Sequence, residues 1–213
     1  EVSANVQIIA TKDINWTFTA NVGYNKNKIT QLFQGRDEYT LANTGLKLKI
    51  GHANGEFCSV RNAGVDPRTG EPQWYDKDGN ITKIFNEERD AVFTGKNRYA
   101  PWIGGFGTNF TWKGLSVIAD FAWAADKWMM QNDDYFIKNA NFTTTWNQRV
   151  EMLNIWTTPG QVTDIPAYGY DIHVDDKMIQ NASFLRMKTL TLQYDLPKKW
   201  LAPTRYIKGV KVF

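Results

Sequence analysis

Apolar and polar residues alternate with a period of two near the start of the chain. From residue 16 to 25 the even positions hold Trp, Phe, Ala, Val and Tyr, while the odd positions hold Thr, Asn and Gly. Residues 2–10 repeat the pattern, with Val, Ala and Ile at even positions, and the polar sequence Thr11-Lys12-Asp13 separates the two stretches. This arrangement predicts an antiparallel hairpin with one apolar and one polar face.

A second hairpin is predicted at residues 106–123. Apolar residues fall mainly on even positions up to Trp112 and on odd positions from Leu115, with Lys113-Gly114 between them. Glycine adopts the positive φ of a tight hairpin turn without steric cost, so the turn is expected at this dipeptide.

A third pair of strands is predicted at residues 184–194 and 206–213, joined by a segment that contains Pro197. The alternation in the first of these strands is imperfect. Arg186 and Lys188 fall in the same alternating set as Leu190, Leu192 and Tyr194. We expect these two cations to lie near a membrane headgroup boundary, or to extend their side chains to it.

The connections differ greatly in length. Turns within hairpins are short, whereas residues 26–104 and 125–182 separate one hairpin from the next. Long connections without regular structure are uncommon in compact soluble domains. Short turns on one side and long loops on the other are typical of outer-membrane β-barrels, whose short turns are periplasmic. The prediction is an all-β fold: an incomplete antiparallel transmembrane barrel of about six strands with long extracellular loops.

Each face of the predicted sheet has an expected environment. The polar face is rich in Thr, Asn, Ser and Gly and poor in Lys and Glu, which favours a barrel lumen over a soluble surface. Lumen-facing residues are expected to be Thr17, Thr19, Asn21, Asn109, Thr111 and Asp120. Lipid-facing residues are expected to be Val6, Ile8, Phe18, Val22, Phe110, Val117 and Phe121. The aromatic girdles are expected at Trp16, Tyr24, Trp112, Trp123 and Tyr194. Soluble sheets also alternate, so the alternative is a sandwich whose apolar face packs on a second sheet.

Composition narrows the function classes. The 25 basic and 22 acidic residues give a net charge of +3, which is too balanced for a nucleic-acid-binding surface. The longest uninterrupted apolar stretch is Phe121–Ala125, and a spanning helix needs about 20 such residues, so helical insertion is excluded. The chain begins at Glu1 and ends at Phe213, each within a strand pattern, and we expect the sequence to continue on both sides.

No motif for catalysis or cofactor binding is present. Cys58 is the only cysteine, and neither His52 nor His173 has a partner at ligand or catalytic spacing. Asp133-Asp134 and Asp175-Asp176 are interpreted as solvated carboxylates in polar loops. We expect no enzyme activity, no cofactor and no metal site.

The sequence Asp76-Lys77-Asp78-Gly79 resembles the start of a calcium loop. An EF-hand requires its glycine at position six, whereas here glycine occupies position four. An Asp-Gly hairpin turn is the simpler interpretation.

Aromatic residues are concentrated in the second long connection. Flat rings interleaved with Asn and Gln side chains suit the face of a sugar, or a peptide. A self-packed loop or a protein–protein contact is the alternative. Substrate contact is expected from some of these rings, namely Trp128, Tyr135, Trp146 and Trp156.

Five segments, in order, resemble the SusC-like (SusC/RagA) TonB-dependent outer-membrane transporters. Two lie early in the chain: residues 11–30 (TKDINWTFTANVGYNKNKIT) and 63–79 (AGVDPRTGEPQWYDKDG). The third runs from Gly104 to Ile118 around the sequence WKGL, and the last two are residues 156–166 (WTTPGQVTDIP) and 181–197 (NASFLRMKTLTLQYDLP). The five segments have an order and spacing compatible with the family, and together they span nearly the whole chain.

The resemblance implies a function that the residues alone do not give. It implies that residues 1–213 belong to the later part of a receptor barrel, without its plug domain and closing strand. Such proteins import oligosaccharides or peptides across the outer membrane of Gram-negative bacteria. They are energised by TonB through the plug and pair with a SusD-like surface lipoprotein, and they have no nucleic-acid partner. The alternative from another class is a soluble β-sandwich that binds carbohydrate through the aromatic loop.

Overall fold

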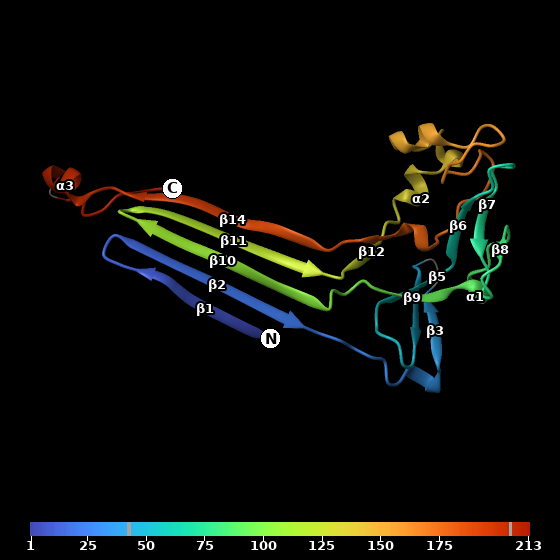
Figure 1. The fold of residues 1–213 in the computed structure, drawn as a ribbon, viewed down its shortest axis with the longest axis horizontal. Coiled ribbons are helices and arrows are strands. Elements are labelled where there is room, and N and C mark those ends of the chain that lie inside the picture. Colours follow the sequence, from blue (N-terminus) through green and yellow to red (C-terminus); the bar gives the residue numbers. More distant parts are fainter. Residues whose placement is uncertain (42–43, 205) are drawn as a thin grey trace. The chain divides into compact units, whose positions relative to one another are not determined.

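The alternating segments form the strands of one open antiparallel sheet in the computed structural model, which describes residues 1–41, 44–204 and 206–213 (Figure 1). The sheet belongs to the first of two compact units, which comprises Glu1–Lys26, Ala100–Asp126 and Ser183–Phe213. The second unit comprises Asn27–Tyr99 and Lys127–Ala182 and is called the loop unit below.

The six strands of the sheet follow one another in sequence order, and every neighbouring pair is antiparallel. They are β1 (Val2–Ala10), β2 (Ile14–Tyr24), β10 (Trp102–Trp112), β11 (Leu115–Ala125), β14 (Phe184–Asp195) and β15 (Lys211–Val212). The predicted all-β barrel segment of about six strands is confirmed. The predicted extent of the last strand, residues 206–213, is wrong, because only Lys211–Val212 pairs with β14.

The turns form where the sequence predicts them. Lys113 and Gly114 have φ values of 47° and 91°, the positive values that a two-residue hairpin turn with matching twist requires. At the first turn, the backbone N–H of Thr11 donates to Ile14 O (2.8 Å) and the N–H of Ile14 donates back to Thr11 Oγ1 (3.0 Å). After β14, Pro197 precedes the short helices α3 (Lys198–Leu201) and η5 (Ala202–Thr204).

A bulge in β14 corrects the prediction for its cations. Asp120 lies opposite Thr189, whereas the next residue, Phe121, lies opposite Met187, so Lys188 is an extra residue in β14. The extra residue reverses the alternation. Arg186 therefore lies opposite Ala122 on the polar face and does not share a face with Leu190. The prediction was wrong because a bulge is set by pairing with β11, which the sequence of β14 alone does not show.

A second bulge lies in β1. Val6 is paired with Phe18 and Ile9 with Trp16, so Ile8 is the extra residue. Ile9, not Ile8, therefore occupies the paired position next to Val6 on the apolar face.

Aromatic rings bridge the strands on the apolar face. Phe106 packs between Phe18 and Phe121, with ring centroids 6.3 and 4.8 Å away. One row further, the indole of Trp123 covers Gly104, where a Cβ atom would come 2.7 Å from the ring. Cross-strand aromatic pairs and a ring laid over a glycine both fix the register of a sheet.

The long connections contain regular structure, contrary to the prediction of structureless loops. A four-stranded sheet holds β3 (Glu38–Leu41), β4 (Leu46–Lys49), β5 (Glu56–Ser59) and β9 (Val92–Asn97). A three-stranded sheet holds β6 (Arg61–Val65), β7 (Pro72–Tyr75) and β8 (Ile81–Thr82), and β12 (Trp128–Met130) pairs with β13 (Ile179–Asn181). The helices are single turns: η1 (Phe33–Gly35), α1 (Glu87–Asp90), α2 (Asp134–Ile137), η2 (Ala140–Phe142), η3 (Val150–Asn154) and η4 (Asp176–Met178).

Most of the buried apolar side chains belong to the loop unit. They include Phe57, Cys58, Val60, Trp74, Ile165, Met178 and Ile179. Short strands without a clear period thus gain their stability from a shared core between two insertions distant in sequence.

Within the described part of the chain, no helix has the length and apolar character needed to cross a membrane.

Candidate functional site

The register places all six residues predicted to face a lumen on one side of the sheet. Thr17 lies opposite Asn109, and Thr19 lies opposite Gly107, which in turn lies opposite Asp120. Asn21 and Thr111 belong to the same set of alternating positions. Hydroxyl, amide and carboxylate groups therefore form a continuous polar surface.

This polar face contains a shallow depression of about 600 Å³. Gly105 and Gly107 form its floor, with Thr19, Asn21 and Asp120 around them. A methyl group at Gly107 would overlap Asp120 Oδ1. The depression therefore depends on the absence of side chains at these glycines, which leaves backbone and small polar groups open to hydrogen bonding.

The opposite face of the sheet is apolar, and its large side chains are half-buried or exposed. Val6, Phe18, Val22, Phe110, Val117 and Phe121, six of the seven residues predicted to face lipid, lie there. The bulge separates the seventh, Ile8, from this paired set. Leu185, Leu190 and Leu192 on β14 belong to the same face and are 64%, 63% and 61% exposed. Among the described residues of this unit no second sheet covers the apolar face, which is unfavourable in water.

Aromatic residues mark both ends of the apolar face. Trp112 and Tyr194 share the row nearest the short turns, and Trp16 lies one row further in. At the other end, Tyr24 packs against Trp102 with ring centroids 4.4 Å apart, and Trp123 lies one row further in. The two outermost rows are ten residues apart on β10, which corresponds to roughly 25 Å along a membrane normal for a strand tilted by about 40°.

Trp102 was missed in the sequence. The alternation of its strand is evident only from residue 106, because Gly104 and Gly105 obscure it. Extending the even positions of β10 back through these glycines would have found it.

The structure brings together two of the four aromatic residues predicted to contact substrate. Phe136 joins Tyr135 and Trp146 into one cluster, with ring centroids 5.1 and 5.7 Å away, and Trp146 is 50% exposed. The other two lie apart. Trp128 lies beneath Lys96 Nζ, which is 4.6 Å from its ring. Trp156 donates its Nε1–H to Pro67 O (3.1 Å) and packs over Gly70, so it stabilises a turn.

A groove of about 430 Å³ lies beside this cluster. Its lining is mostly aromatic and apolar, with one carboxylate: Phe85, Glu87, Asn132, Tyr135, Phe136, Ile172, His173 and Val174. The imidazole of His173 stacks on Phe85 with centroids 4.2 Å apart, and its partial burial lowers the pKa of His173. The sequence alone assigns no role to His173, because its ring partner lies nearly ninety residues earlier.

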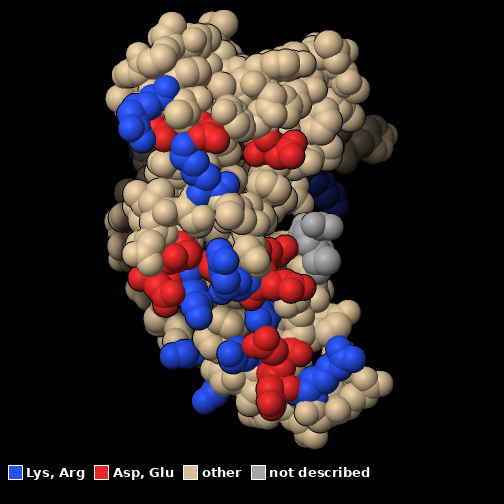
Figure 2. Space-filling view, turned by 90° about the vertical axis from the view of Figure 1, so that its right-hand side faces the viewer, with Lys and Arg blue, Asp and Glu red and all other residues tan. Residues whose placement is uncertain are grey.

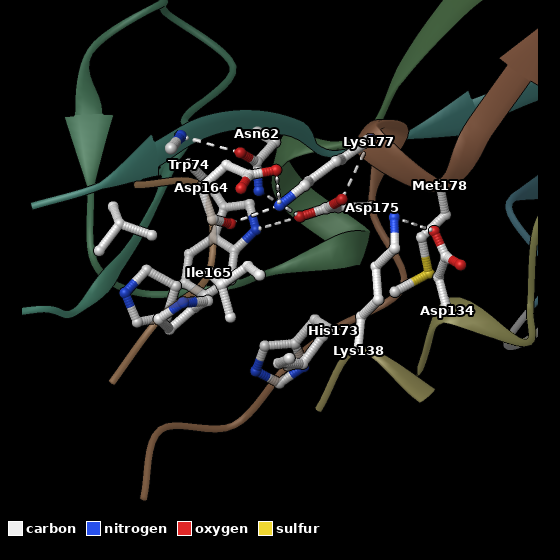
Figure 3. A pocket seen from close by; sticks show the side chains of 15 residues that line it. Asn62, Trp74, Asp134, Lys138, Asp164, Ile165, His173, Asp175, Lys177 and Met178 are labelled. Carbon is white, nitrogen blue, oxygen red and sulfur yellow. Dashed lines mark hydrogen bonds and ion pairs between the residues drawn. The ribbon is translucent and has the colours of Figure 1, made fainter. Parts of the chain in front are cut away.

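A smaller cavity of about 60 Å³ shares Ile172 and His173 with the groove, and Asp175 is one of the residues that line it (Figure 3). Asp175 Oδ2 accepts hydrogen bonds from Asn62 Nδ2 (2.6 Å) and Trp74 Nε1 (2.9 Å), and Asp175 Oδ1 accepts the N–H of Lys177 (3.1 Å). Burial raises the pKa of Asp175, although these donors oppose the shift. The carboxylate thus ties β6 and β7 to the segment before β13.

Two predictions about acidic pairs are wrong. Asp175 is 4% exposed and Asp134 is 7% exposed, so neither pair is fully solvated. Asp134 forms ion pairs with Lys138 (3.0 Å) and Arg149 (3.1 Å). The partners of both carboxylates are set by tertiary packing, which the dipeptides themselves do not reveal.

The Asp76–Gly79 segment is the hairpin turn between β7 and β8. Asp76 Oδ1 accepts the N–H groups of Asp78 (2.9 Å) and Asn80 (2.8 Å), and Gly79 has a φ of 89°.

Within the described residues, no group of three or more His, Cys, Asp or Glu side chains is placed to hold a metal ion. On the face shown in Figure 2, basic and acidic side chains are interleaved, without a broad region of one sign.

Comparisons with known proteins show what the chain is similar to. No protein-family model matches the chain. The TonB-dependent receptor SusC of Bacteroides thetaiotaomicron is 24% identical over 99% of this chain, and TonB-dependent receptor P3 of Formosa agariphila is 22% identical over 96%. The structure of the RagAB peptide transporter matches 98% of this chain with a TM-score of 0.89 and 38% identity.

The chain is SusC-like in sequence and in fold. This SusC-like chain spans 21–22% of the length of the curated receptors it matches, and 24% of the matched RagAB chain. The resemblance derived from the five sequence segments is confirmed. Its relatives are named as receptors and transporters, and none of these names describes an enzyme.

Proposed function

We propose that residues 1–213 form part of the barrel domain of a TonB-dependent outer-membrane importer. The six-stranded sheet would be a section of the barrel wall, and the loop unit would be extracellular. The observation that carries this proposal is the two-faced sheet, whose exposed apolar face is bounded by aromatic rows at a spacing suited to a bilayer. The whole protein would act in the outer membrane of a Gram-negative bacterium.

The two faces of the sheet would have different roles in the importer. The polar face, with Thr17, Thr19, Asn21, Asn109, Thr111 and Asp120, would face the lumen. The apolar face would contact lipid, and Trp16, Tyr24, Trp112, Trp123 and Tyr194 would lie at the headgroup level, together with Trp102. A hydrogen-bonding lumen with few charged side chains suits passage of a polar cargo or contact with a plug.

Peptides are the favoured cargo over glycans. The RagAB structure, which is 38% identical over 98% of this chain, is named for a peptide cargo, whereas the name of SusC states no cargo. The groove beside Tyr135 and Phe136 has the volume of a small ligand site. Tyr135 and Trp146 are the best-placed candidates for substrate contact. The contact of Trp128 with Lys96 and the hydrogen bond of Trp156 to Pro67 O argue for structural roles of these two residues.

The importer would work with a SusD-like surface lipoprotein, as the SusC resemblance implies, and with TonB through a plug. The loop unit would supply part of the surface that meets the lipoprotein. Exposed Trp146, Leu153 and Val162 give it the apolar surface that such an interface needs.

An uptake experiment tests the proposed function. The complete transporter and its lipoprotein are expressed in the outer membrane, and uptake of a fluorescent oligopeptide is compared with that of a maltooligosaccharide of similar mass. We expect TonB-dependent peptide uptake that exceeds glycan uptake. Uptake of neither cargo, or uptake independent of TonB, would contradict the importer assignment, while preferred glycan uptake would contradict only the choice of cargo.

A further inference from the structure

The short-turn end of the six-stranded sheet is strongly basic. Its turn segments are residues 11–13, 113–114 and 195–212, and their described acidic residues are Asp13 and Asp195. The lysines of these segments, called the lysine rim below, are Lys12, Lys113, Lys198, Lys199, Lys208 and Lys211. The sheet's other end has no such excess, since two acidic residues, Glu1 and Asp126, and two basic residues, Lys26 and Lys127, lie beside its strand ends.

Backbone hydrogen bonds hold the turn segments side by side. The N–H of Lys113 donates to Asp13 O (3.0 Å), which joins the first turn to the second. The N–H of Asp195 donates to Gly114 O (2.8 Å), which joins the second turn to the third. The lysine rim is therefore one structural feature and not a set of cations scattered along the sequence.

Most of the rim charge is uncompensated within the described structure. All six lysines are exposed. Lys211 Nζ lies 3.6 Å from Asp195 Oδ1, and this is the one ion pair that the described residues form with the rim. Lys113 Nζ lies 5.9 Å from the ring of Trp112, which leaves its charge unneutralised. A partner with several negative charges would match this surface.

The rim borders the aromatic row at the end of the apolar face. Trp112 is 47% exposed, and Trp200, which follows Lys199 in α3, is 60% exposed. Amphipathic rings lie at the headgroup level of membranes, and lysine side chains extend from there to phosphate groups. A lipid surface would meet the apolar face, the rings and the rim together, whereas a soluble anion would contact only the lysines.

We propose that the lysine rim binds the phosphate groups of anionic phospholipids in the leaflet around the short turns. The inference rests on the proposed insertion of the sheet in the outer membrane. Clusters of four to eight basic residues beside a membrane-embedded segment bind anionic headgroups through their summed charge. The bound lipids would hold the short-turn end of the sheet at a fixed depth in the bilayer.

Native mass spectrometry of the complete transporter tests the proposal. The protein is extracted from mixed vesicles of equal phosphatidylglycerol and phosphatidylcholine, and the retained lipids are counted. The double variant Lys198→Gln/Lys199→Gln is compared with Lys26→Gln/Lys28→Gln, which removes the same charge elsewhere. We expect the wild type and the control to retain phosphatidylglycerol preferentially, and the rim variant to lose that preference about fivefold or more.

Two results would overturn the proposal. One is equal retention of both lipids by the wild type, and the other is an unchanged preference in the rim variant. A parallel extraction with lipid A in the vesicles separates the two leaflets, and rim-dependent retention of lipid A instead of phosphatidylglycerol would also contradict the assignment. Heat-modifiable migration of the same samples reports on barrel insertion, and peptide uptake by cells that express the same variants reports on import, so failure of the lipid inference is distinguishable from failure of the proposed function.

Discussion

The indole Nε1 of Trp74 donates a buried hydrogen bond of 2.9 Å to Asp175 Oδ2, across 101 residues of sequence. Trp74 belongs to the first long connection and Asp175 to the second. The bond, with that from Asn62, converts two separate insertions into one folded loop unit. A carboxylate that is 4% exposed requires these donors, because burying it without them would be costly.

Removing the donor at Trp74 should loosen the loop unit. Trp74→Phe keeps an aromatic ring in the core but leaves Asp175 short of one donor, which we expect to cost about 1–3 kcal/mol. The measurement is limited proteolysis of the complete transporter, followed as loss of intact loop unit. Trp156→Phe is the matched control, because its hydrogen bond to Pro67 O is exposed, and its expected effect is smaller. Equal protease sensitivity of the two variants would show that the buried bond is not important.

Acidification should weaken the loop unit through His173. Burial lowers the pKa of His173 below the 6.5 of the unfolded chain, so the unfolded state binds the proton more tightly. The stabilisation is fully present above about pH 6.5 and is lost as pH falls through the folded pKa. We expect proteolysis to accelerate between pH 7 and pH 5, measured with a protease whose own pH profile is corrected on an unfolded substrate.

The variant His173→Phe isolates this effect. It keeps a ring stacked on Phe85 and removes the titrating group. Asp175, whose pKa is raised by burial, acts in the opposite direction, since protonation of this carboxyl favours the folded state. The variant should therefore show little destabilisation between pH 7 and pH 5, above the range in which carboxyls with lowered pKa values titrate, and acid sensitivity equal to that of the wild type in this range would contradict the role of His173.

Two glycines of the sheet should respond differently to a methyl group. In Gly104→Ala the new Cβ would overlap the backbone oxygen of Asn21 and the ring of Trp123, and we expect a cost of about 1–3 kcal/mol. In Gly23→Ala the nearest atom is Ile103 Cγ1 at 3.6 Å, an ordinary contact, so the change should be nearly neutral. The stability of both variants is measured as the urea concentration at which half of the protein loses its heat-modifiable migration on gels. A Gly104→Ala variant as stable as the wild type would contradict the register between β2 and β10.

Charge should be tolerated on only one face of β2. Phe18→Arg places a guanidinium on the apolar face near its centre, which should cost about 2–4 kcal/mol in a bilayer, whereas Thr19→Arg should cost much less. The amount of assembled protein in outer-membrane fractions measures the difference. Similar assembly of the two variants would contradict the assignment of the faces.

The sequence predicts the sheet well and the loop unit poorly, for physical reasons. The two faces of β2, β10 and β11 have different environments, so apolar and polar residues alternate in the sequence with a period of two. The turn at Lys113-Gly114 is also predictable, because glycine readily adopts the positive φ that the turn requires. The bulges at Ile8 and Lys188 depend on the partner strand and leave no local signal.

In the loop unit, burial is decided by contacts between distant segments. Asp175 is buried because Asn62 and Trp74 reach it, and Trp156 is engaged because the Pro67–Gly70 turn lies against it. A single sequence shows neither relationship. The aromatic cluster around Phe136 could be anticipated in part, since its rings are close together in sequence.

The measurement that tests the membrane-wall account most directly is a spin-label scan of residues 16–24 in the complete transporter. Single cysteines are labelled there, and Cys58 should stay unlabelled, since it is 4% exposed and burial raises its pKa to about 11. Collisions with oxygen report contact with lipid, and collisions with a water-soluble nickel chelate report contact with water. If the apolar face contacts lipid, oxygen accessibility is high at even positions, including Phe18, and nickel accessibility is relatively higher at odd positions, including Thr19. Even positions shielded from both reagents would indicate a dry core between two sheets and would contradict the account.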